Sequence, residues 1–144
     1  MRSISTEIII EASASKVWQV LMDHQSYPKW NPFIRSISGA PEVGKTISAH
    51  IQPEGQKAMH FQPLVLVHEP EKEFRWKGKL FISGLFDGEH FFRLEQMGAD
   101  KTRFVHVENF TGLLVPPLLA MIGDSTRQGF EAMNRALKEQ AECR

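Results

Sequence analysis

Short segments in which apolar and polar residues alternate fill the middle of this chain, and a single long helical pattern follows them. Alternation with a period of two is typical of strands, because side chains two residues apart lie on the same face of a sheet. The connections are short and contain glycine, proline and aspartate, which predicts antiparallel hairpins. The segments expected to form these strands are FIRSIS, TISAHI, AMHFQPLVLVHE, EFRWKGKLF, FDGEHFFRLEQ and TRFVHVENF.

The first 33 residues predict one strand, one short helix and a compact turn. In the segment SISTEIIIE, the residues expected to share one face of a strand are Ile4, Thr6, Ile8 and Ile10. A helix is predicted directly after it, with Ser13 as its N-cap. Pro28 and Pro32 follow in the segment YPKWNPF. They impose extended geometry on Tyr27 and Asn31, so any helix here is limited to a turn or two.

The last segment, from Leu113 to about Gln140, predicts one long helix. Pro116 and Pro117 suit its first turn, where the missing N–H groups have no partner to lose. At 1.5 Å per residue such a helix is about 35–40 Å long, enough to cross a sheet. The apolar residues that recur at helical spacing are Met121, Ile122, Phe130, Met133 and Leu137.

This order of elements predicts an α+β fold, with helices segregated to one face of an antiparallel sheet. We expect residues 1–144 to form a single domain. Its curved sheet of about six to seven strands would wrap around the long C-terminal helix and leave an internal cavity, and two short helices would follow the first strand. Gly123 and Gly129 lie inside that helix, where each glycine lowers helix stability by about 1 kcal/mol relative to alanine. A close approach of the sheet, a bend that opens a mouth, or simple tolerance would each account for them.

The composition narrows the possible partners. Lys and Arg together number 17, as do Asp and Glu, so no net charge recruits nucleic acid or an anionic membrane. The apolar run GLLVPPLLAMIG is too short to span a bilayer, and the N-terminus has no signal-peptide pattern. We therefore expect a cytoplasmic protein without stable membrane insertion. The single cysteine, Cys143, permits no internal disulfide and is expected to be exposed.

Strand parity predicts an interior that is mostly aromatic. The residues that it places inside, on three successive strands, are Phe74, Trp76 and Leu80, then His90, Phe92 and Leu94, then Phe104, His106, Glu108 and Phe110. A short loop near Gly98 would align the last two strands, so that His90 lies opposite Glu108 or His106 within hydrogen-bond reach. These three polar residues are the candidate catalytic residues.

Three polar groups in an apolar cavity have more than one interpretation. They orient the carbonyl or hydroxyl group of a ligand, or Glu108 accepts a proton beside a histidine, or the three satisfy one another inside the core. The residue types suit zinc or iron, but no HExxH or paired-cysteine spacing supports a metal, and none is expected. No phosphate- or dinucleotide-binding fingerprint is present in the sequence, and no cofactor is expected.

Three segments, SASKVWQVLMDHQSYPKWNPFI, FDGEHFFRLE and ENFTGLL, together resemble the SRPBCC superfamily. This superfamily includes START lipid-transfer domains, birch-pollen-allergen-like proteins and polyketide cyclase/dehydrase-like proteins, and the last two segments resemble the cyclase-like branch. The resemblance covers nearly the whole chain. It implies a helix-grip fold around a deep, mostly apolar pocket, and it does not imply one particular reaction.

The residues expected to contact a ligand in such a pocket are Trp30, Phe74, Trp76, His90, Phe92, Phe104, His106, Glu108, Phe110, Leu118 and Ile122. Three hypotheses follow from the resemblance and the predicted pocket. The first is binding of a hydrophobic or aromatic small molecule that is lipid- or polyketide-like. The second is a polyketide cyclase or dehydratase that uses Glu108 with a pocket histidine. The third is a co-chaperone- or toxin-like module that works through a protein partner.

The aromatic residues of YPKWNPF have two interpretations. In the first, Trp30 and Phe33 close one end of the cavity or pack beneath the short helices, and Asn31 bonds nearby backbone. In the second, Tyr27 and Trp30 form a gate at the mouth of the pocket. Large aromatic side chains more often serve the core, but the sequence leaves both interpretations open.

The outer face of the sheet has an apolar component as well. Phe91, Val105 and Val107 lie there among charged residues, either as a small association patch for a weak homodimer or as ordinary exposed surface. His60 and His68 belong to a segment that is apolar on both faces, so parity gives no orientation for either histidine.

Overall fold

The computed structural model describes residues 1–80 and 82–143 of the chain. The elements, in chain order, are β1 (Arg2–Ile10), α1 (Ala14–Met22), the 3-10 turn η1 (His24–Ser26), α2 (Tyr27–Trp30), β2 (Ile34–Ser38), β3 (Ser48–Ile51), β4 (Met59–Phe61), β5 (Leu64–Glu69), β6 (Glu73–Leu80), β7 (Phe86–Gly98), β8 (Lys101–Thr111) and α3 (Val115–Glu142).

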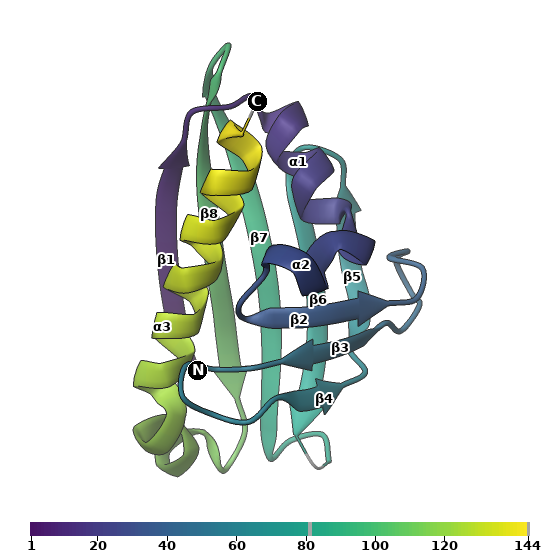
Figure 1. Cartoon of the computed structure of the whole chain (residues 1–144). Coiled ribbons are helices and arrows are strands. Elements are labelled where there is room, and N and C mark those ends of the chain that lie inside the picture. The colour runs from purple at the N-terminus through teal and green to yellow at the C-terminus, as the bar shows by residue number, and fades with distance from the viewer. Residues whose placement is uncertain (81, 144) are drawn as a thin grey trace.

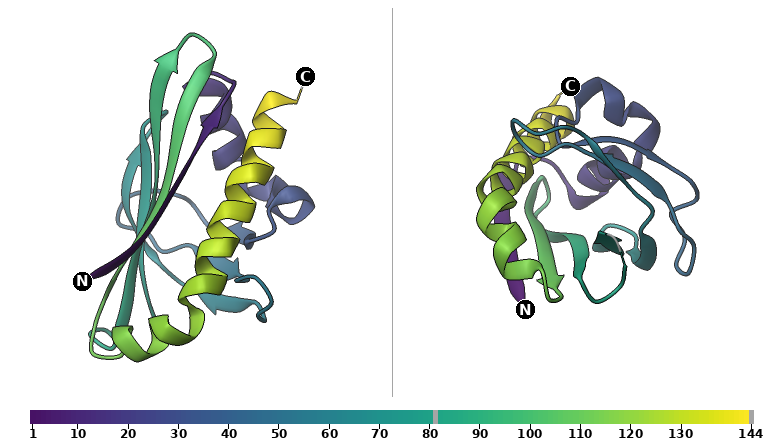
Figure 2. Two further views of the ribbon diagram at one scale, coloured as in Figure 1. Left: turned by 90° about the vertical axis from the view of Figure 1, so that its left-hand side faces the viewer. Right: turned by 90° about the horizontal axis from the view of Figure 1, so that it is seen from below.

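The strands of the described part form two antiparallel sheets. One has five strands in the order β1-β8-β7-β6-β5, and the other has three in the order β2-β3-β4. A single bridge between Thr46 and Leu64 links them. The long helix α3 lies across β1 and β8, while the smaller sheet crosses in front of β5 and β6 (Figure 1). Seen from below, the two sheets and α3 surround a central region (Figure 2).

The predicted α+β architecture is confirmed, and the strand count is resolved at eight in the described residues. The segment AMHFQPLVLVHE, expected as one strand, accounts for the additional strand. It breaks at Pro63 into β4 and β5, because proline has no N–H to donate to a sheet. β5 joins the large sheet, and β4 joins the small one.

The N-terminal helices follow the sequence signals with one exception. Ser13 caps α1, and its hydroxyl accepts a hydrogen bond from the backbone N–H of Lys16 at 3.1 Å. Tyr27 was expected to be extended before Pro28, but this prediction is wrong, since Tyr27 has helical angles (φ −53°, ψ −42°). Pro28 lies in the first turn of α2, where proline is tolerated. The buried Tyr27 hydroxyl also donates to the carbonyl of Leu21, which stabilises this geometry.

Asn31 has the predicted extended geometry (φ −84°, ψ 113°) and turns the chain into β2. Its side-chain Oδ1 accepts hydrogen bonds from the backbone N–H groups of Phe33, at 2.9 Å, and Ile34, at 2.8 Å. This is the backbone bonding that the sequence predicts for an asparagine between two prolines. The turn directs the Phe33 ring into the core, where it packs against Phe130 with the ring centroids 5.3 Å apart.

The helix α3 has its two prolines in the first turn, as predicted, and buries Phe130, Met133 and Leu137 against the sheet. Met121 was expected on the same stripe, but this prediction is wrong, because its side chain is 77% exposed. It precedes Phe130 by nine residues, or two and a half turns, which places it on the opposite side of the helix.

The two helix glycines have different explanations. A Cβ atom at Gly129 would lie 2.4 Å from the ring of Phe33, so only glycine permits this close approach. The neighbour is a side chain that precedes β2 rather than the sheet backbone. A Cβ atom at Gly123 would meet nothing within 4 Å, which is consistent with simple tolerance.

The outer face of the large sheet does not expose the apolar patch that parity suggested around Phe91. Phe91 is buried, and the guanidinium groups of Arg75 and Arg93 cover its ring at 4.0 and 5.0 Å from the centroid. Glu73 and Glu89 hold those guanidinium groups in place. Cation–π contacts therefore cover the ring that was proposed for association.

No helix in residues 1–80 and 82–143 is both long enough and apolar enough to cross a membrane.

Candidate functional site

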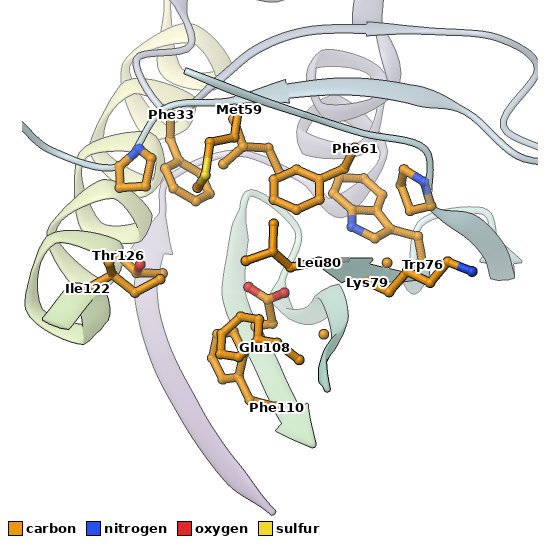
Figure 3. A pocket seen from close by; sticks show the side chains of 16 residues that line it. Phe33, Met59, Phe61, Trp76, Lys79, Leu80, Glu108, Phe110, Ile122 and Thr126 are labelled. Atoms are coloured by element: carbon orange, nitrogen blue, oxygen red, sulfur yellow. The ribbon is translucent and has the colours of Figure 1, made fainter. Parts of the chain in front are cut away.

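A cavity lies between the inner face of the large sheet, the β4 edge of the small sheet and the N-terminal half of α3. The sheet contributes Trp76, Leu80, Phe86 and Phe110, and β4 contributes Met59 and Phe61 (Figure 3). The centres of water molecules can occupy about 70 Å³ of it, and the whole space including the open mouth is about 660 Å³. The lining is mostly aromatic and aliphatic, as in small-molecule sites.

Glu108 is the acidic residue among the described residues that line this cavity. It comes from the middle of β8, and its side chain is 19% exposed. Figure 3 shows its carboxyl group pointing toward Leu80, whereas the amine of Lys79 extends away from it. The carboxyl group lies over Gly88 of β7, where a Cβ atom would be 2.1 Å from Oε2. Glycine at this position therefore makes the space that the carboxyl group occupies.

Two buried histidines lie directly behind Glu108. His90 is opposite Glu108 in the β7–β8 register, as predicted, and its Nδ1 is 3.4 Å from Glu108 Oε1. The Nε2 atoms of His90 and His106 are 2.8 Å apart. Both imidazoles are almost completely shielded from solvent, so Glu108 is the member of this group that faces the cavity.

Two further polar residues continue this chain of contacts to α3 and β1. The Nδ1 of His106 is 2.9 Å from Asn134 Oδ1. The Nδ2 of Asn134 donates to Thr6 Oγ1 at 2.9 Å, and the Thr6 hydroxyl donates to the backbone carbonyl of His106 at 3.1 Å. We call Thr6, Asn134, His106, His90 and Glu108 the polar chain. It runs from β1 through the core to the cavity.

Aromatic rings enclose the histidines on both sides. The ring of Phe130 stacks on His106 with the centroids 4.0 Å apart and the planes 8° apart, and Trp76 stacks on His90 at 5.0 Å. This enclosure removes water from the rings, and burial disfavours an imidazolium. Burial lowers the pKa of His106 well below its usual 6.5, and the nearby His90 lowers it further, so His106 is neutral at pH 7.

The structure places the predicted site residues at three depths. Four of them line the cavity, namely Trp76, Glu108, Phe110 and Ile122. His90 and His106 lie behind Glu108, while Phe74, Phe92 and Phe104 are core residues and Leu118 packs partly against that core. Trp30 does not line the cavity; it packs edge-on against Tyr27 and borders an outer groove.

Several lining residues were absent from the predicted set. Met59 and Phe61 belong to the segment that is apolar on both faces, which hid their orientation. Phe33 was expected to close one end of the cavity or to pack beneath the short helices. Asn134 had a readable signal, because it lies one turn after Phe130 on the buried stripe of the predicted helix. A polar residue at that spacing indicates a buried hydrogen-bond partner.

The histidines left without orientation have separate surroundings. His60 faces solvent on the small sheet, where its ring stacks on that of His50 at 4.7 Å. His68 bonds the carbonyl of Pro41 and lies 5.7 Å from the rings of both Trp18 and Phe74. Neither residue contributes to the cavity lining. In the part of the chain that the structure describes, no group of three or more His, Cys, Asp or Glu side chains is arranged to hold a metal ion.

Comparison with known proteins settles the family. A sequence model described as "Polyketide cyclase / dehydrase and lipid transport" matches residues 1–142. The chain belongs to this family. The match confirms the resemblance to the SRPBCC superfamily noted from the sequence. A search of curated proteins gives no match.

Solved structures agree on the helix-grip fold at low sequence identity. The Zhui aromatase/cyclase from a Streptomyces species is 16% identical, with a TM-score of 0.78 over 98% of this chain and 93% of that one. A START superfamily protein from Mycobacterium smegmatis is 18% identical, with a TM-score of 0.71 over 95% and 97%. A norcoclaurine synthase point mutant from Thalictrum is 15% identical, with a TM-score of 0.72 over 97% and 93%.

Proposed function

We propose that this protein binds a small, largely apolar molecule in the cavity, and that Glu108 holds the polar group of that molecule. One observation carries the proposal: an accessible carboxyl group, backed by a buried histidine, stands in a pocket whose other walls are mostly apolar. A few polar groups that converge in an apolar pocket are the usual form of a small-molecule site. The family description, which includes lipid transport, supports the same proposal.

The size of the cavity limits the ligand. Drug-sized ligands occupy pockets of roughly 300–1,000 Å³, whereas the volume of this cavity is about 70 Å³. A single ring or one end of a longer molecule therefore fits with the side chains as they stand. A larger ligand requires Met59 and Phe61 to move. Both belong to β4, a three-residue strand at the edge of the small sheet.

The polar chain favours a second candidate function, a proton-transfer enzyme of the cyclase or dehydratase type. In this function Glu108 removes a proton from the carbon next to a ligand carbonyl, or from a hydroxyl group, and His90 stabilises the charge that develops. The name of the Zhui aromatase/cyclase, a protein of the same fold, supports this candidate. Binding alone does not require two histidines in series behind the carboxyl group. This arrangement is the observation that favours the enzyme candidate.

The first experiment is native mass spectrometry of the purified protein, with extraction and identification of any molecule that co-purifies. Ligand titration follows, read by tryptophan fluorescence, because Trp76 lines the cavity. The Glu108→Gln variant keeps much of the binding affinity under both candidates and loses turnover only under the second. The matched control is Glu69→Gln, which alters an exposed carboxylate on β5.

An apo mass, together with no fluorescence response to aromatic alcohols or fatty acids, would contradict binding. A protein partner would then become the better hypothesis. Full turnover of an identified substrate by Glu108→Gln would contradict the enzyme candidate alone.

A further inference from the structure

We propose that His90 and Glu108 hold one shared proton, and that Thr6 and Asn134 impose this by fixing the tautomers of both histidines. The cavity-facing oxygen of Glu108 is then an acceptor, so the cavity selects ligands that carry a hydroxyl donor, such as a phenol or an enol. The selection of ligand rests on the proposed function, whereas the shared proton is a property of the free protein.

The direction of the polar chain is set at Thr6. A threonine hydroxyl has one proton, and Thr6 directs it at the backbone carbonyl of His106, 3.1 Å away. Thr6 Oγ1 must therefore accept from Asn134, whose side-chain nitrogen lies 2.9 Å from it. This orients the amide of Asn134 with its oxygen toward His106. An amide orientation is assigned from such a network, and this assignment lets Thr6 donate to the His106 carbonyl while it accepts from Asn134.

The tautomer of His106 follows from Asn134. An amide oxygen accepts only, so His106 Nδ1 carries the proton of that 2.9 Å contact. Burial lowers the pKa of His106 well below 6.5, so the ring has no second proton at pH 7. His106 Nε2 is therefore an acceptor. His90 Nε2, at 2.8 Å, must be the donor.

The tautomer of His90 leaves its other nitrogen facing Glu108. With a proton on Nε2, a neutral His90 presents a lone pair at Nδ1, and an ionised Glu108 presents another at Oε1, 3.4 Å away. Two acceptors at this distance repel each other, and His90 is buried. One proton between them removes the conflict, either as imidazolium with carboxylate or as neutral imidazole with carboxylic acid. Both arrangements leave the pair without net charge.

Groups on neighbouring elements do not supply a competing charge. From β6, Trp76 presents its ring face to His90, and the amine of Lys79 points away from Glu108 (Figure 3). From α3, Thr126 at the cavity and Asn134 at His106 are neutral. From β1, Thr6 is neutral as well. The shared proton is thus the means by which the described residues balance the Glu108 charge.

The second oxygen of Glu108 determines which ligands are suitable. None of the described residues donates a hydrogen bond to Oε2, which lies over Gly88 at the cavity wall. In both arrangements of the shared proton Oε2 accepts, so a ligand hydroxyl is the complementary group. A ligand O–H proton can move to Oε2 while the Oε1 proton moves to His90 Nδ1. The products are a ligand oxyanion, a neutral carboxylic acid and an imidazolium, with no change of total charge.

The test of the shared proton is side-chain ¹⁵N and ¹³C NMR of the ligand-free protein. We expect His106 as the Nδ1–H tautomer and one exchangeable proton between His90 and Glu108 at pH 7. In Asn134→Leu, His106 has no acceptor for Nδ1–H. It should switch to the Nε2–H tautomer and reverse His90, which then keeps its only proton on Nδ1 facing an ionised Glu108. His90 Nε2 loses its proton, and the pair carries one proton fewer than in the natural protein.

A matched pair at the other end of the polar chain guards against a folding defect in Asn134→Leu. Thr6→Ser keeps the hydroxyl and should preserve both tautomers, whereas Thr6→Val removes it and should give mixed tautomers at His106. An Nε2–H tautomer of His106 in the natural protein would overturn the proposal. Unchanged tautomers in folded Asn134→Leu would overturn the role of Asn134.

The ligand prediction has its own readout. We expect 4-methylphenol to bind at least tenfold more tightly than its methyl ether, because Glu108 Oε2 accepts a hydrogen bond from the hydroxyl group and can receive none from the ether. Equal affinity for the two compounds would overturn the selection of hydroxyl donors. If neither compound nor any other small molecule binds, the proposed function is wrong. The NMR experiment on the ligand-free protein still tests the shared proton.

Discussion

Gly88 shows how one residue without a side chain positions another that has a role in the cavity. It lies two residues before His90 on β7, and the carboxyl group of Glu108 occupies the space where its Cβ would be. Its direct partner in the β6–β7 register is Gly78, where a Cβ would meet only Pro63 at 3.6 Å. Gly78 therefore has room for an added methyl group, whereas Gly88 has none unless Glu108 moves.

We expect Gly88→Ala to displace the Glu108 carboxyl group and to lower the free energy of unfolding by about 1–3 kcal/mol, the usual range for overpacking. Gly78→Ala is the matched control and should stay within about 0.5 kcal/mol of the natural protein. Urea denaturation measures both values. Equal stability of the two variants would show that Glu108 moves aside without loss.

The helix α3 presents the same contrast at the scale of an element. Gly129 is where α3 approaches the ring of Phe33, and Gly123 is one place where nothing lies near the helix surface. The helix gains stability from any glycine-to-alanine change, because glycine is about 1 kcal/mol less favourable in a helix interior. Contact with Phe33 opposes that gain at Gly129 only.

Gly123→Ala should therefore raise the free energy of unfolding by up to about 1 kcal/mol. Gly129→Ala should lower it by about 1–3 kcal/mol, because the new methyl group would displace Phe33. Thermal and urea unfolding of the two variants give opposite signs if this account is correct. Stabilisation by both would mean that Phe33 relaxes freely.

The cap of α1 permits a second test on an element. Ser13→Ala removes the acceptor for the Lys16 N–H and should lower the free energy of unfolding by about 1 kcal/mol. Ser13→Asp keeps an acceptor at the N-cap and serves as the control. A loss of stability in both variants would show that Ser13 does more than cap the helix.

Elements that present one apolar face could be predicted from sequence, and elements without such a pattern could not. Parity on β6, β7 and β8, with a short loop near Gly98, placed His90 opposite Glu108 or His106, and the register has Glu108. β4 has no such alternation, so Met59 and Phe61 could not be assigned to the cavity. Tyr27 is helical although residues before proline prefer extended geometry, because its burial and its hydrogen bond to the Leu21 carbonyl outweigh that preference.

At the scale of the whole molecule, two histidines oppose folding when they become charged: the partly buried His24 and the buried His106. Burial lowers the pKa of His24 to about 4, with Asp23 partly opposing the change, and also lowers the pKa of His106. The Nε2 of His24 is buried and has no hydrogen-bond partner among the described residues. In the unfolded chain both imidazoles return to a pKa near 6.5.

Folded-state pKa values below the unfolded value mean that the unfolded chain binds more protons as the pH falls below about 6.5. These two histidines should lower stability as the pH falls from about 6.5 toward 4, with His24 contributing about 3 kcal/mol in total. Urea midpoints between pH 7.5 and 4.5 measure the decline. His24→Phe should make the decline shallower, and an unchanged slope in that variant would contradict the assignment to His24.

The division of the strands into two sheets has a consequence for how the cavity exchanges its contents. β4 joins β3 through three residue pairs, and Glu54 in the preceding loop bonds the carbonyl of Ser125 on α3. Local unfolding requires less free energy where few backbone hydrogen bonds must break. Amide hydrogens of β4 should therefore exchange with solvent faster than those of β7 and β8. Their exchange rate reports how often this wall of the cavity opens.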